Sequence, residues 1–199
     1  MLSSNLVRFL CALVSVAIVP AYGQSTFPDY PAKPAGEYSA STQTAGLTIG
    51  AEPVDDVEEQ KNYFHTEFSK KGFVPVFLVI QNGSNGDNFL FDKAKVRYGP
   101  ADNGVSTPKE GSKAGQSLAL AAIPFVGLFA SLKVIQNASE VQQNFVRKEL
   151  QSTTLSSGAS ASGFLYIPVP KNTPREKIHL SVPITKAGTD ETYVLDLVF

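Results

Sequence analysis

The alternation of apolar and polar positions along the chain predicts a succession of short β-strands. Segments rich in Val, Ile, Leu, Phe and Tyr are bounded by Gly, Asn, Ser and Pro, which is typical of strands and their turns. We expect strands over residues 47–51, 73–80, 88–98, 164–169, 177–184 and 192–199. Six or seven strands at this spacing predict a mainly β fold, an antiparallel β-sandwich.

Two neighbouring segments carry the clearest strand signal. Residues 73–80 are dense in β-branched and aromatic side chains, residues 82–88 are turn material, and residues 88–98 resume the strand pattern. We expect these two strands to be adjacent and antiparallel. Pro75 is expected near the start of its strand, at an edge or at a bulge, because proline has no N–H to donate.

A long apolar stretch interrupts the strand pattern. Residues 114–132 contain no charged side chain, and the amphipathic sequence that follows spaces its apolar residues as a helix does. We predict a helical insertion at about residues 116–151, which makes the fold α+β. Ser139 and Gln142 have the spacing of a capping box, so one long helix and a helical hairpin both stay open.

The apolar side of this insertion is the predicted docking surface. An exposed apolar patch marks a contact with a protein or a membrane surface, whereas helices that cap an open face of the sandwich would extend its core. Both interpretations stay open. The candidate docking residues are Leu118, Leu120, Ile123, Phe125, Val126, Leu128, Phe129, Leu132, Val134, Val141 and Phe145.

The same apolar run has almost the length of a membrane span. Residues 114–132, at a rise of about 1.5 Å each, would cover roughly 28 Å as a helix, close to the roughly 30 Å hydrocarbon core. A span would separate the strands before and after it, which could then share no core. We therefore expect the run to stay on one side of the membrane.

The first residues have the features of an export signal. Arg8 precedes a short apolar core, and residues 21–23 have a small-x-small arrangement. We predict a signal peptide over residues 1–23 and a periplasmic or extracellular location, with a peripheral membrane position open. Cys11 lacks the context for lipid attachment, because Arg8, Phe9 and Leu10 precede it.

The residues after the predicted signal have the composition of a flexible linker. Residues 24–45 are rich in Pro, Ser, Thr and Ala and show no apolar period. The alternative is a recognition tail with Tyr30 and Tyr38 as anchors. Residues 46–199 are then a single β domain that contains the insertion.

Composition excludes several classes of partner and site. Without residues 1–23 the chain has no cysteine, so its core alone must hold it together. Removing Arg8 from the 17 basic residues leaves 16 against 18 acidic ones, a formal charge of −2, which argues against a nucleic-acid partner.

We predict no enzymatic activity, no cofactor and no metal site. His65 and His179 are more simply strand residues at a sheet surface than zinc ligands. The sequence around Ser160 has neither the spacing nor the helix expected of a hydrolase elbow. The acidic cluster at residues 55–59 lacks a calcium-loop frame and is read as a solvated acidic loop.

Several segments resemble known exported domains. The stretches FLVIQN, NFLFDKAKVRY and LSSGASASGFLYIPVP, followed by two closing strands, resemble the immunoglobulin-like domains of exported bacterial envelope proteins. Over about residues 47–199, the chain is similar to a group of uncharacterised exported proteins and lipoproteins. The similar segments are YFHTEFSKKGFVPVFLVIQN, the apolar insertion, NFVRKEL and SGFLYIPVP. The resemblance implies an immunoglobulin-like fold and an envelope location but no activity.

The predicted function is a non-enzymatic binding or structural module of the cell envelope. Its partner would be an envelope protein or a membrane surface that meets the apolar insertion. The alternative is a carrier that holds a lipid or another apolar ligand between helices and sheet. Any small-molecule ligand is left unspecified.

Overall fold

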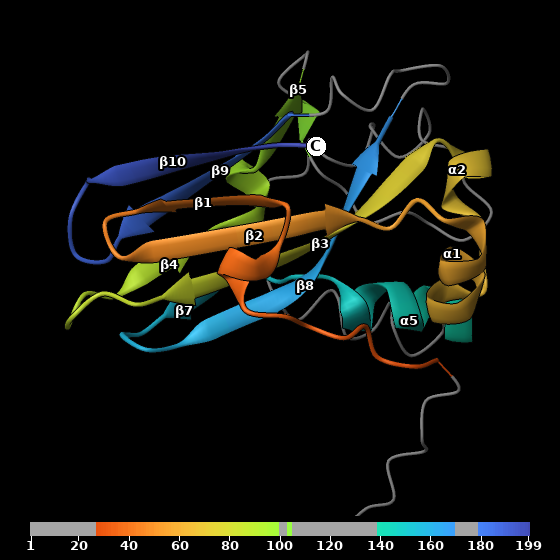
Figure 1. The fold of residues 1–199 in the computed structure, drawn as a ribbon, viewed down its shortest axis with the longest axis horizontal. Helices are drawn as coiled ribbons and strands as arrows, with labels where there is room; N and C mark the ends of the chain where they lie inside the picture. The colour runs from red at the N-terminus through yellow and green to blue at the C-terminus, as the bar shows by residue number, and fades with distance from the viewer. Residues whose placement is uncertain (1–26, 100–102, 105–138, 170–178) are drawn as a thin grey trace, which may run out of the picture.

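Two antiparallel sheets form the body of this mainly β protein. A computed structural model describes residues 27–99, 103–104, 139–169 and 179–199. Sheet A has the order β1 (Ala40–Thr44), β2 (Leu47–Pro53), β3 (Phe73–Asn82) and β8 (Ser160–Pro168), as Figure 1 shows. The predicted signal peptide and residues 116–138 of the predicted insertion lie outside the described residues.

Sheet B is built around β9 (His179–Lys186), which pairs along one side with β10 (Thr192–Val198). On its other side β9 pairs with β4 (Phe89–Phe91) at one end and with β5 (Arg97–Gly99) at the other. The outer strands are β7 (Thr153–Leu155) beside β4 and β6 (Asn103–Gly104) beside β5.

The predicted strand over residues 88–98 is interrupted. The short 3-10 helix η2 (Lys93–Lys95) separates β4 from β5, and the Asp92 carboxylate accepts a hydrogen bond from the Ala94 N–H at 3.0 Å. A side chain that bonds to nearby backbone offers an alternative to the sheet ladder. The chain therefore turns out of the sheet for three residues and returns to the same side of β9.

A shared core lies between the two sheets. Alternate residues of β2, β3 and β8 and of β9 and β10 point into it. Its fully buried members include Ile49, Leu78 and Leu165 from sheet A, and Val182 and Ile184 from sheet B. β1 and β10 lie next to each other, so the two sheets also meet along one side of the molecule (Figure 1).

The expected pairing of the segments at 73–80 and 88–98 is wrong. β3 pairs with β2 and β8, whereas β4 pairs with β7 and β9, so the two segments belong to different sheets. The turn between them begins at the buried Asn82, whose side-chain amide donates to the Asp87 carbonyl at 2.8 Å and to the Leu155 carbonyl at 3.1 Å. These bonds hold the turn as a crossing between sheets rather than a hairpin.

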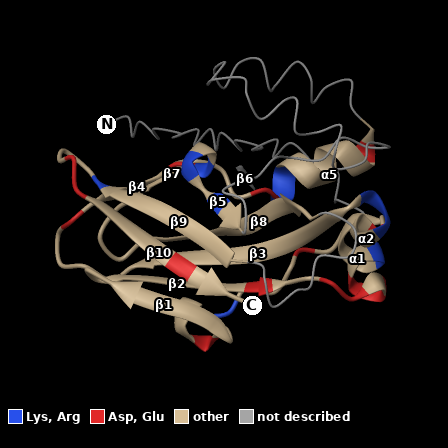
Figure 2. Cartoon of the chain, turned by 90° about the horizontal axis from the view of Figure 1, so that it is seen from above, with Lys and Arg blue, Asp and Glu red and all other residues tan. Residues whose placement is uncertain are grey.

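Three short helices lie on the side of sheet A that faces away from sheet B. They are α1 (Val57–Phe64), α2 (Phe68–Lys71) and α5 (Glu140–Lys148). Figure 2 shows that charged residues gather on these helices and in loops, while the strands are nearly uncharged. None of the helices among the described residues is long and apolar enough to cross a membrane.

The acidic cluster at residues 55–59 opens a helix and is not a loop. The Asp56 carboxylate accepts a hydrogen bond from the Glu59 N–H at 2.9 Å, and Glu58 and Glu59 lie in the first turn of α1. Carboxylates are favourable there because the backbone N–H groups of a first turn have no partner within the helix. The cluster therefore has a local structural role.

Half of the capping box predicted at Ser139 is confirmed, namely its N-cap hydrogen bond. The Ser139 hydroxyl accepts a hydrogen bond from the Gln142 N–H at 3.2 Å, and α5 begins at Glu140. Its last residue is Lys148, three residues before the predicted end at Gln151. A fresh helix thus starts at Glu140.

The prediction of a flexible linker is wrong from Phe27 onward. Ala35–Glu37 form the 3-10 helix η1, Ala40–Thr44 form β1, and Ala35 and Tyr38 are buried. The composition is that of a linker, but tertiary contacts hold the segment on sheet A. We call residues 27–38 the N-terminal strap.

Candidate functional site

The structure describes two of the eleven predicted docking residues. Phe145 is fully buried, and Val141 packs against the same cluster of buried side chains. Phe145 therefore belongs to the core and to no exposed surface. The other nine, residues 118–134, lie outside the described residues.

Phe145 is part of an outer aromatic cluster between sheet A and the helices. The ring of Phe68 lies 5.1 Å from that of Phe145 and 5.3 Å from that of Tyr166, measured between centroids. Phe64 lies 4.8 Å from Phe164 in an edge-to-face arrangement. Such ring pairs add about 0.5–1.5 kcal/mol each beyond the area that they bury.

Tyr166 ties this cluster to α5. Its hydroxyl donates to the Phe145 carbonyl at 2.9 Å, and the side chain is fully buried. Burial raises the pKa of the Tyr166 phenol well above its ordinary value, with a smaller contribution from Glu149. The phenol is therefore a neutral donor, satisfied inside the core.

The chain leaves the outer cluster around the edge of β8. Glu149 bridges to Phe164, and the Leu150 N–H donates to the Phe164 carbonyl at 2.9 Å. A Cβ atom at Gly163 would lie 2.7 Å from the Leu150 nitrogen, so only glycine fits where the two segments cross. Leu150 then enters the shared core.

The N-terminal strap lies across the outer aromatic cluster, and its residues 27–34 form neither helix nor strand. Figure 1 shows it running along the helix side of sheet A, from α5 toward β2. Pro28, Pro31 and Pro34 recur every third residue and are exposed, and Pro34 has φ −54° and ψ 140°. The angles of Pro34 lie in the polyproline II region, and the period of the prolines is the three residues per turn of that conformation.

The residues that anchor the strap follow the same period of three. Phe27 is buried against the His65 ring at 4.3 Å between centroids. Tyr30 lies within 5.2 Å of three aromatic rings, and the Lys33 ammonium pairs with the Glu52 carboxylate at 3.2 Å. One edge of the strap therefore faces the domain, and the prolines lie on the others.

Tyr30 makes the densest contacts of the strap. Its ring lies 4.9 Å from Tyr63, 4.7 Å from Phe77 and 5.2 Å from Phe164. Its hydroxyl donates to Glu52 at 2.8 Å. Burial raises the pKa of the Tyr30 phenol, and the hydrogen bond to the Glu52 carboxylate raises it further.

Lys148 connects three separate segments. Its ammonium donates to the Pro28 carbonyl of the strap and to the Tyr63 carbonyl at the end of α1, at 2.9 Å for the latter. The Nζ atom lies 5.4 Å from the Tyr63 ring centroid and 5.5 Å from that of Phe64. Burial lowers the pKa of Lys148 to about 8, which Asp29 opposes and Arg147 reinforces.

The strap continues into a close crossing over β2. The Ala35 N–H donates to the Gln81 side-chain oxygen at 3.1 Å. A Cβ atom built on Gly50 would lie 1.9 Å from the Ala35 carbonyl oxygen, so no larger residue fits beneath the strap. Tyr38 is buried and its hydroxyl accepts from the Lys33 N–H at 2.9 Å.

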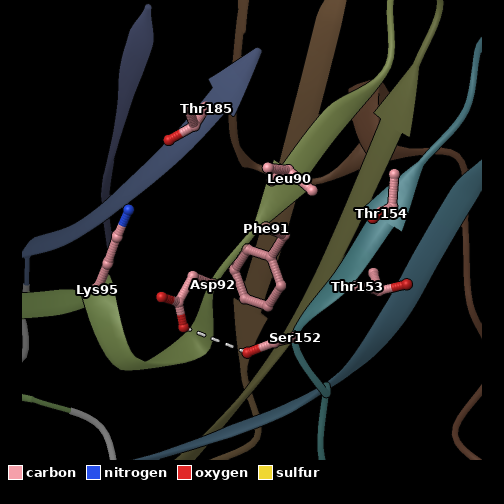
Figure 3. A pocket seen from close by; sticks show the side chains of 8 residues that line it. All are labelled: Leu90, Phe91, Asp92, Lys95, Ser152, Thr153, Thr154 and Thr185. Carbon is pink, nitrogen blue, oxygen red and sulfur yellow. Dashed lines mark hydrogen bonds between the residues drawn. The ribbon is translucent and has the colours of Figure 1, made fainter. Parts of the chain in front are cut away.

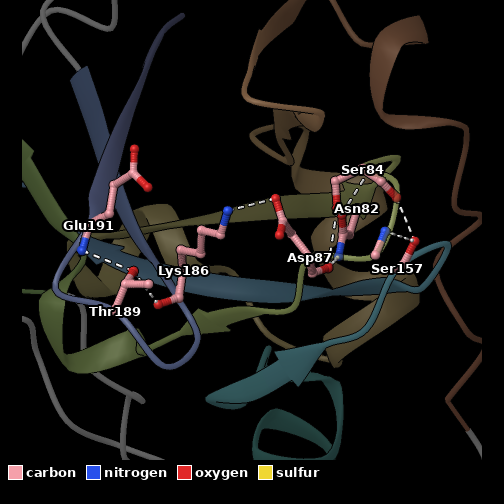
Figure 4. Close-up of polar contacts among 8 residues, drawn as sticks. Asn82, Ser84, Asp87, Ser157, Lys186, Thr189 and Glu191 are labelled. Carbon is pink, nitrogen blue, oxygen red and sulfur yellow. Dashed lines mark hydrogen bonds and ion pairs between the residues drawn. The ribbon is translucent and has the colours of Figure 1, made fainter.

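A polar network joins the two sheets at the Asn82 turn (Figure 4). The Asn82 side-chain oxygen accepts from the Ser84 hydroxyl at 2.6 Å, and Ser157 donates to the Ser84 carbonyl. Asp87 pairs with Lys186 of β9 at 2.9 Å. Asn82-Gly83-Ser84 matches the glycosylation sequon, but the Asn82 amide is buried and donates two hydrogen bonds, so a glycan there is incompatible with this folded turn.

An open pocket of about 360 Å³ lies over the paired strands β4 and β7, beside η2 and β9. Figure 3 shows the side chains that line it, with the Asp92 carboxylate accepting from the Ser152 hydroxyl at 3.3 Å. Asp92 also caps η2, so it has a local structural role. The other lining residues are Leu90, Phe91, Lys95, Thr153, Thr154 and Thr185.

The two histidines lie in different parts of the molecule. His65 follows α1 with φ 51°, and not in a strand as predicted, whereas His179 begins β9. In the described part of the chain no three His, Cys, Asp or Glu side chains are grouped to hold a metal ion.

Neither the family models, nor the curated proteins, nor the solved structures contain a match to this chain.

The strap is the feature that pattern reading missed. The signal in the sequence is a proline at every third residue, each preceded directly by an aromatic or basic residue. A search for a period of three would have found it, because polyproline II repeats at that period. Tyr30 and Tyr38 do anchor this segment, but on the protein's own domain.

Proposed function

We propose that this protein is a non-enzymatic, exported binding module of the cell envelope that docks through its apolar segment at residues 114–132. The fold is proposed to be an immunoglobulin-like variant. Its partner is an envelope protein or the surface of a membrane, and residues 118–134 supply the apolar contact.

The observation that carries the proposal is the position of this uncharged run in the topology. Strands that precede it pair with strands that follow it: β3 pairs with β8, and β4 with β7. The two ends of the run therefore belong to one domain, which disfavours a single crossing of a membrane. An apolar run that connects strands of one domain either joins its core or meets a partner.

The described residues narrow the docking surface. The helix that follows the run, α5, packs against the outer aromatic cluster through Phe145. Ser139 caps that helix at its own start, so α5 does not need the preceding residues to begin. The proposed surface is thus confined to residues 118–134.

The alternative function, a carrier of an apolar ligand between helices and sheet, has less support. The described part of that interface is filled by rings of Phe64, Phe68, Phe145, Phe164 and Tyr166. Their centroids lie 4.8 to 6.4 Å apart. A carrier requires a cavity of several hundred Å³, whereas these rings fill the described part of the interface.

The test replaces residues 116–132 by a Gly/Ser linker of equal length and leaves Ser139 and α5 intact. We expect the variant to keep its urea unfolding midpoint and to lose its association with the envelope fraction. Co-sedimentation with anionic and neutral lipid vesicles separates a membrane surface from a protein partner. Loss of folding instead would make the segment part of the core and end the proposal.

A matched control changes apolar residues elsewhere. Val194 and Val198 are 58 % and 56 % exposed on the outer face of sheet B. Replacing both with Ser removes exposed apolar surface without touching the insertion. This control is expected to fractionate as the intact protein does.

A further inference from the structure

The strap and the surface beneath it have the chemistry of a peptide complex formed within one chain. The strap forms no β-ladder with the sheets, and its anchors from Phe27 to Lys33 recur at every third residue. Recognition of polyproline II segments by aromatic surfaces uses this arrangement. We call the surface made by Glu52, Tyr63, His65, Phe77, Gln81 and Phe164 the strap-binding surface.

The strap-binding surface is built by rigid elements. Phe77 and Phe164 come from the paired strands β3 and β8, and their rings also pack on each other at 5.0 Å. Tyr63 and His65 come from the end of α1, where Phe64 packs into the outer aromatic cluster. These contacts do not involve the strap, so the surface is expected to persist when the strap leaves.

Three separate positions on this surface select the ligand. His65 receives an aromatic ring, the cluster of Tyr63, Phe77 and Phe164 receives a second ring with a hydroxyl, and Glu52 receives that hydroxyl and a basic group. Glu52 is 24 % exposed, so its charge remains accessible to a ligand that arrives from solvent. The three positions hold strap residues 27, 30 and 33, which are residues i, i+3 and i+6, the repeat of polyproline II.

We propose that the strap-binding surface is a recognition site for a proline-rich peptide of a partner protein, and that the strap occupies it in competition with that partner. The recognised peptide carries an aromatic residue, a tyrosine and a basic residue at successive third positions. The charge complementarity between Glu52 and the basic residue fixes the direction of the peptide. A ligand tethered by a short linker has an effective concentration in the millimolar range. The strap therefore competes effectively with a free peptide present at micromolar concentration.

The test uses a fluorescent peptide with the sequence of residues 24–38 as the probe. The protein is the full chain without residues 1–23, intact or opened by Phe27→Ser, Tyr30→Ser and Lys33→Ser together. Fluorescence anisotropy is expected to show saturable binding to the opened protein and at least about ten-fold weaker binding to the intact protein. Equal binding to both, or binding to neither, overturns the proposal.

Two control peptides test the period of three. One carries the Tyr30→Ala change, and the other has the same composition in an order that breaks the i, i+3, i+6 spacing. Both are expected to bind the opened protein at least about ten-fold more weakly than the probe. Equal affinity for the reordered peptide would show general stickiness and would also overturn the proposal.

A gentler variant covers the case in which the opened protein does not fold. Tyr30→Phe with Lys33→Ala keeps the ring and removes both polar links to Glu52. Circular dichroism checks its fold, and the probe is expected to bind it more tightly than the intact protein. No gain in binding by this folded variant contradicts competition by the strap.

Measurement of mass in solution separates a partner from a second copy. A concentration-dependent dimer of the intact protein that Tyr30→Ala abolishes would mean exchange of straps between copies, and it would replace the proposed partner. A monomer at all concentrations, with binding of the probe to the opened protein, supports the partner peptide. The readouts do not involve residues 114–134, so this proposal and the proposed function fail independently.

Discussion

The outer faces of the two sheets differ in almost every respect. The outer face of sheet A is aromatic and lies beneath α1, α2, α5 and the strap, with Phe64, Phe68 and Phe145 fully buried. The outer face of sheet B presents short polar and β-branched residues, with Val194 at 58 % exposure. Among the elements that the structure describes, one sheet is therefore covered on both faces and the other on one.

The burial patterns of the strands reflect this difference between the two sheets. β3 is buried at eight of its ten positions, whereas β9 and β10 alternate between buried and accessible residues. Strands covered on both faces have continuous apolar sequences, and strands covered on one face alternate. The pattern of a strand thus indicates how many layers lie on its sheet.

The largest expected effect is at the centre of the outer aromatic cluster. Phe145→Ala should lower the free energy of unfolding by about 3–5 kcal/mol, because it removes a fully buried ring and leaves a cavity. Urea unfolding monitored by circular dichroism measures the change. Val194→Ala on the outer face of sheet B should stay within about 0.5 kcal/mol. Similar losses for both variants would contradict the contrast between the two faces.

The crossing of the strap over β2 provides the second test. Gly50→Ala should lower the free energy of unfolding by about 3 kcal/mol, because its Cβ would lie 1.9 Å from the Ala35 carbonyl oxygen and the strap must move. Limited proteolysis should then cut within residues 27–38. Gly36→Ala is the matched control, since a Cβ there meets nothing within 4 Å. Resistance of the Gly50 variant to cleavage would disprove the close crossing.

The Asn82 turn is expected to show a smaller effect. Asn82→Ala should lower the free energy of unfolding by about 2 kcal/mol, because the carbonyls of Asp87 and Leu155 lose a buried donor. Exposed Asn85, three residues later in the same turn, is the control, and Asn85→Ala should be nearly neutral. Thermal unfolding compares the two variants, and equal melting temperatures would remove the role assigned to Asn82.

The smallest expected effect is a dependence on pH at Lys148. Its pKa is about 8 in the folded protein and 10.5 ordinarily, so between these values the unfolded chain binds more protons. The free energy of unfolding should therefore rise with pH across this window, relative to Lys148→Met. Urea titrations at about pH 7 and about pH 9.5 compare the two proteins. A wild-type advantage that shrinks as pH rises would show that burial does not control this amine.

The sequence patterns predicted the positions of strands and helix caps better than they predicted which strands pair. The strands beginning at Leu47, Phe73 and Thr192 and the helix cap at Ser139 are confirmed, because each depends on residues close together in the chain. The assignment of β3 and β4 to one pair failed. The chain crosses from one sheet to the other at Asn82, where the side chain bonds to Leu155, far along the chain. A local sequence pattern does not specify such a bond.

Whether the predicted docking residues of α5 face inward or outward could not be predicted from the sequence, for the same reason. A helical spacing of apolar residues identifies which side of α5 is apolar, but not what covers that side. The structure buries Phe145 against Phe68 and Tyr166. The strap was missed because its composition is that of a solvated linker, and its anchors find their rings on residues 33 to 134 positions away.

By itself, the sequence determined where strands and helix caps lie, since propensity, turn chemistry and capping act within a few residues. It also determined, through continuous and alternating strands, that the two sheets are covered differently. Only the tertiary structure decided which strands share a sheet, that the strap lies on sheet A, and that α5 faces inward. Those outcomes depend on burial and hydrogen bonds between residues distant in the chain, which no local pattern specifies.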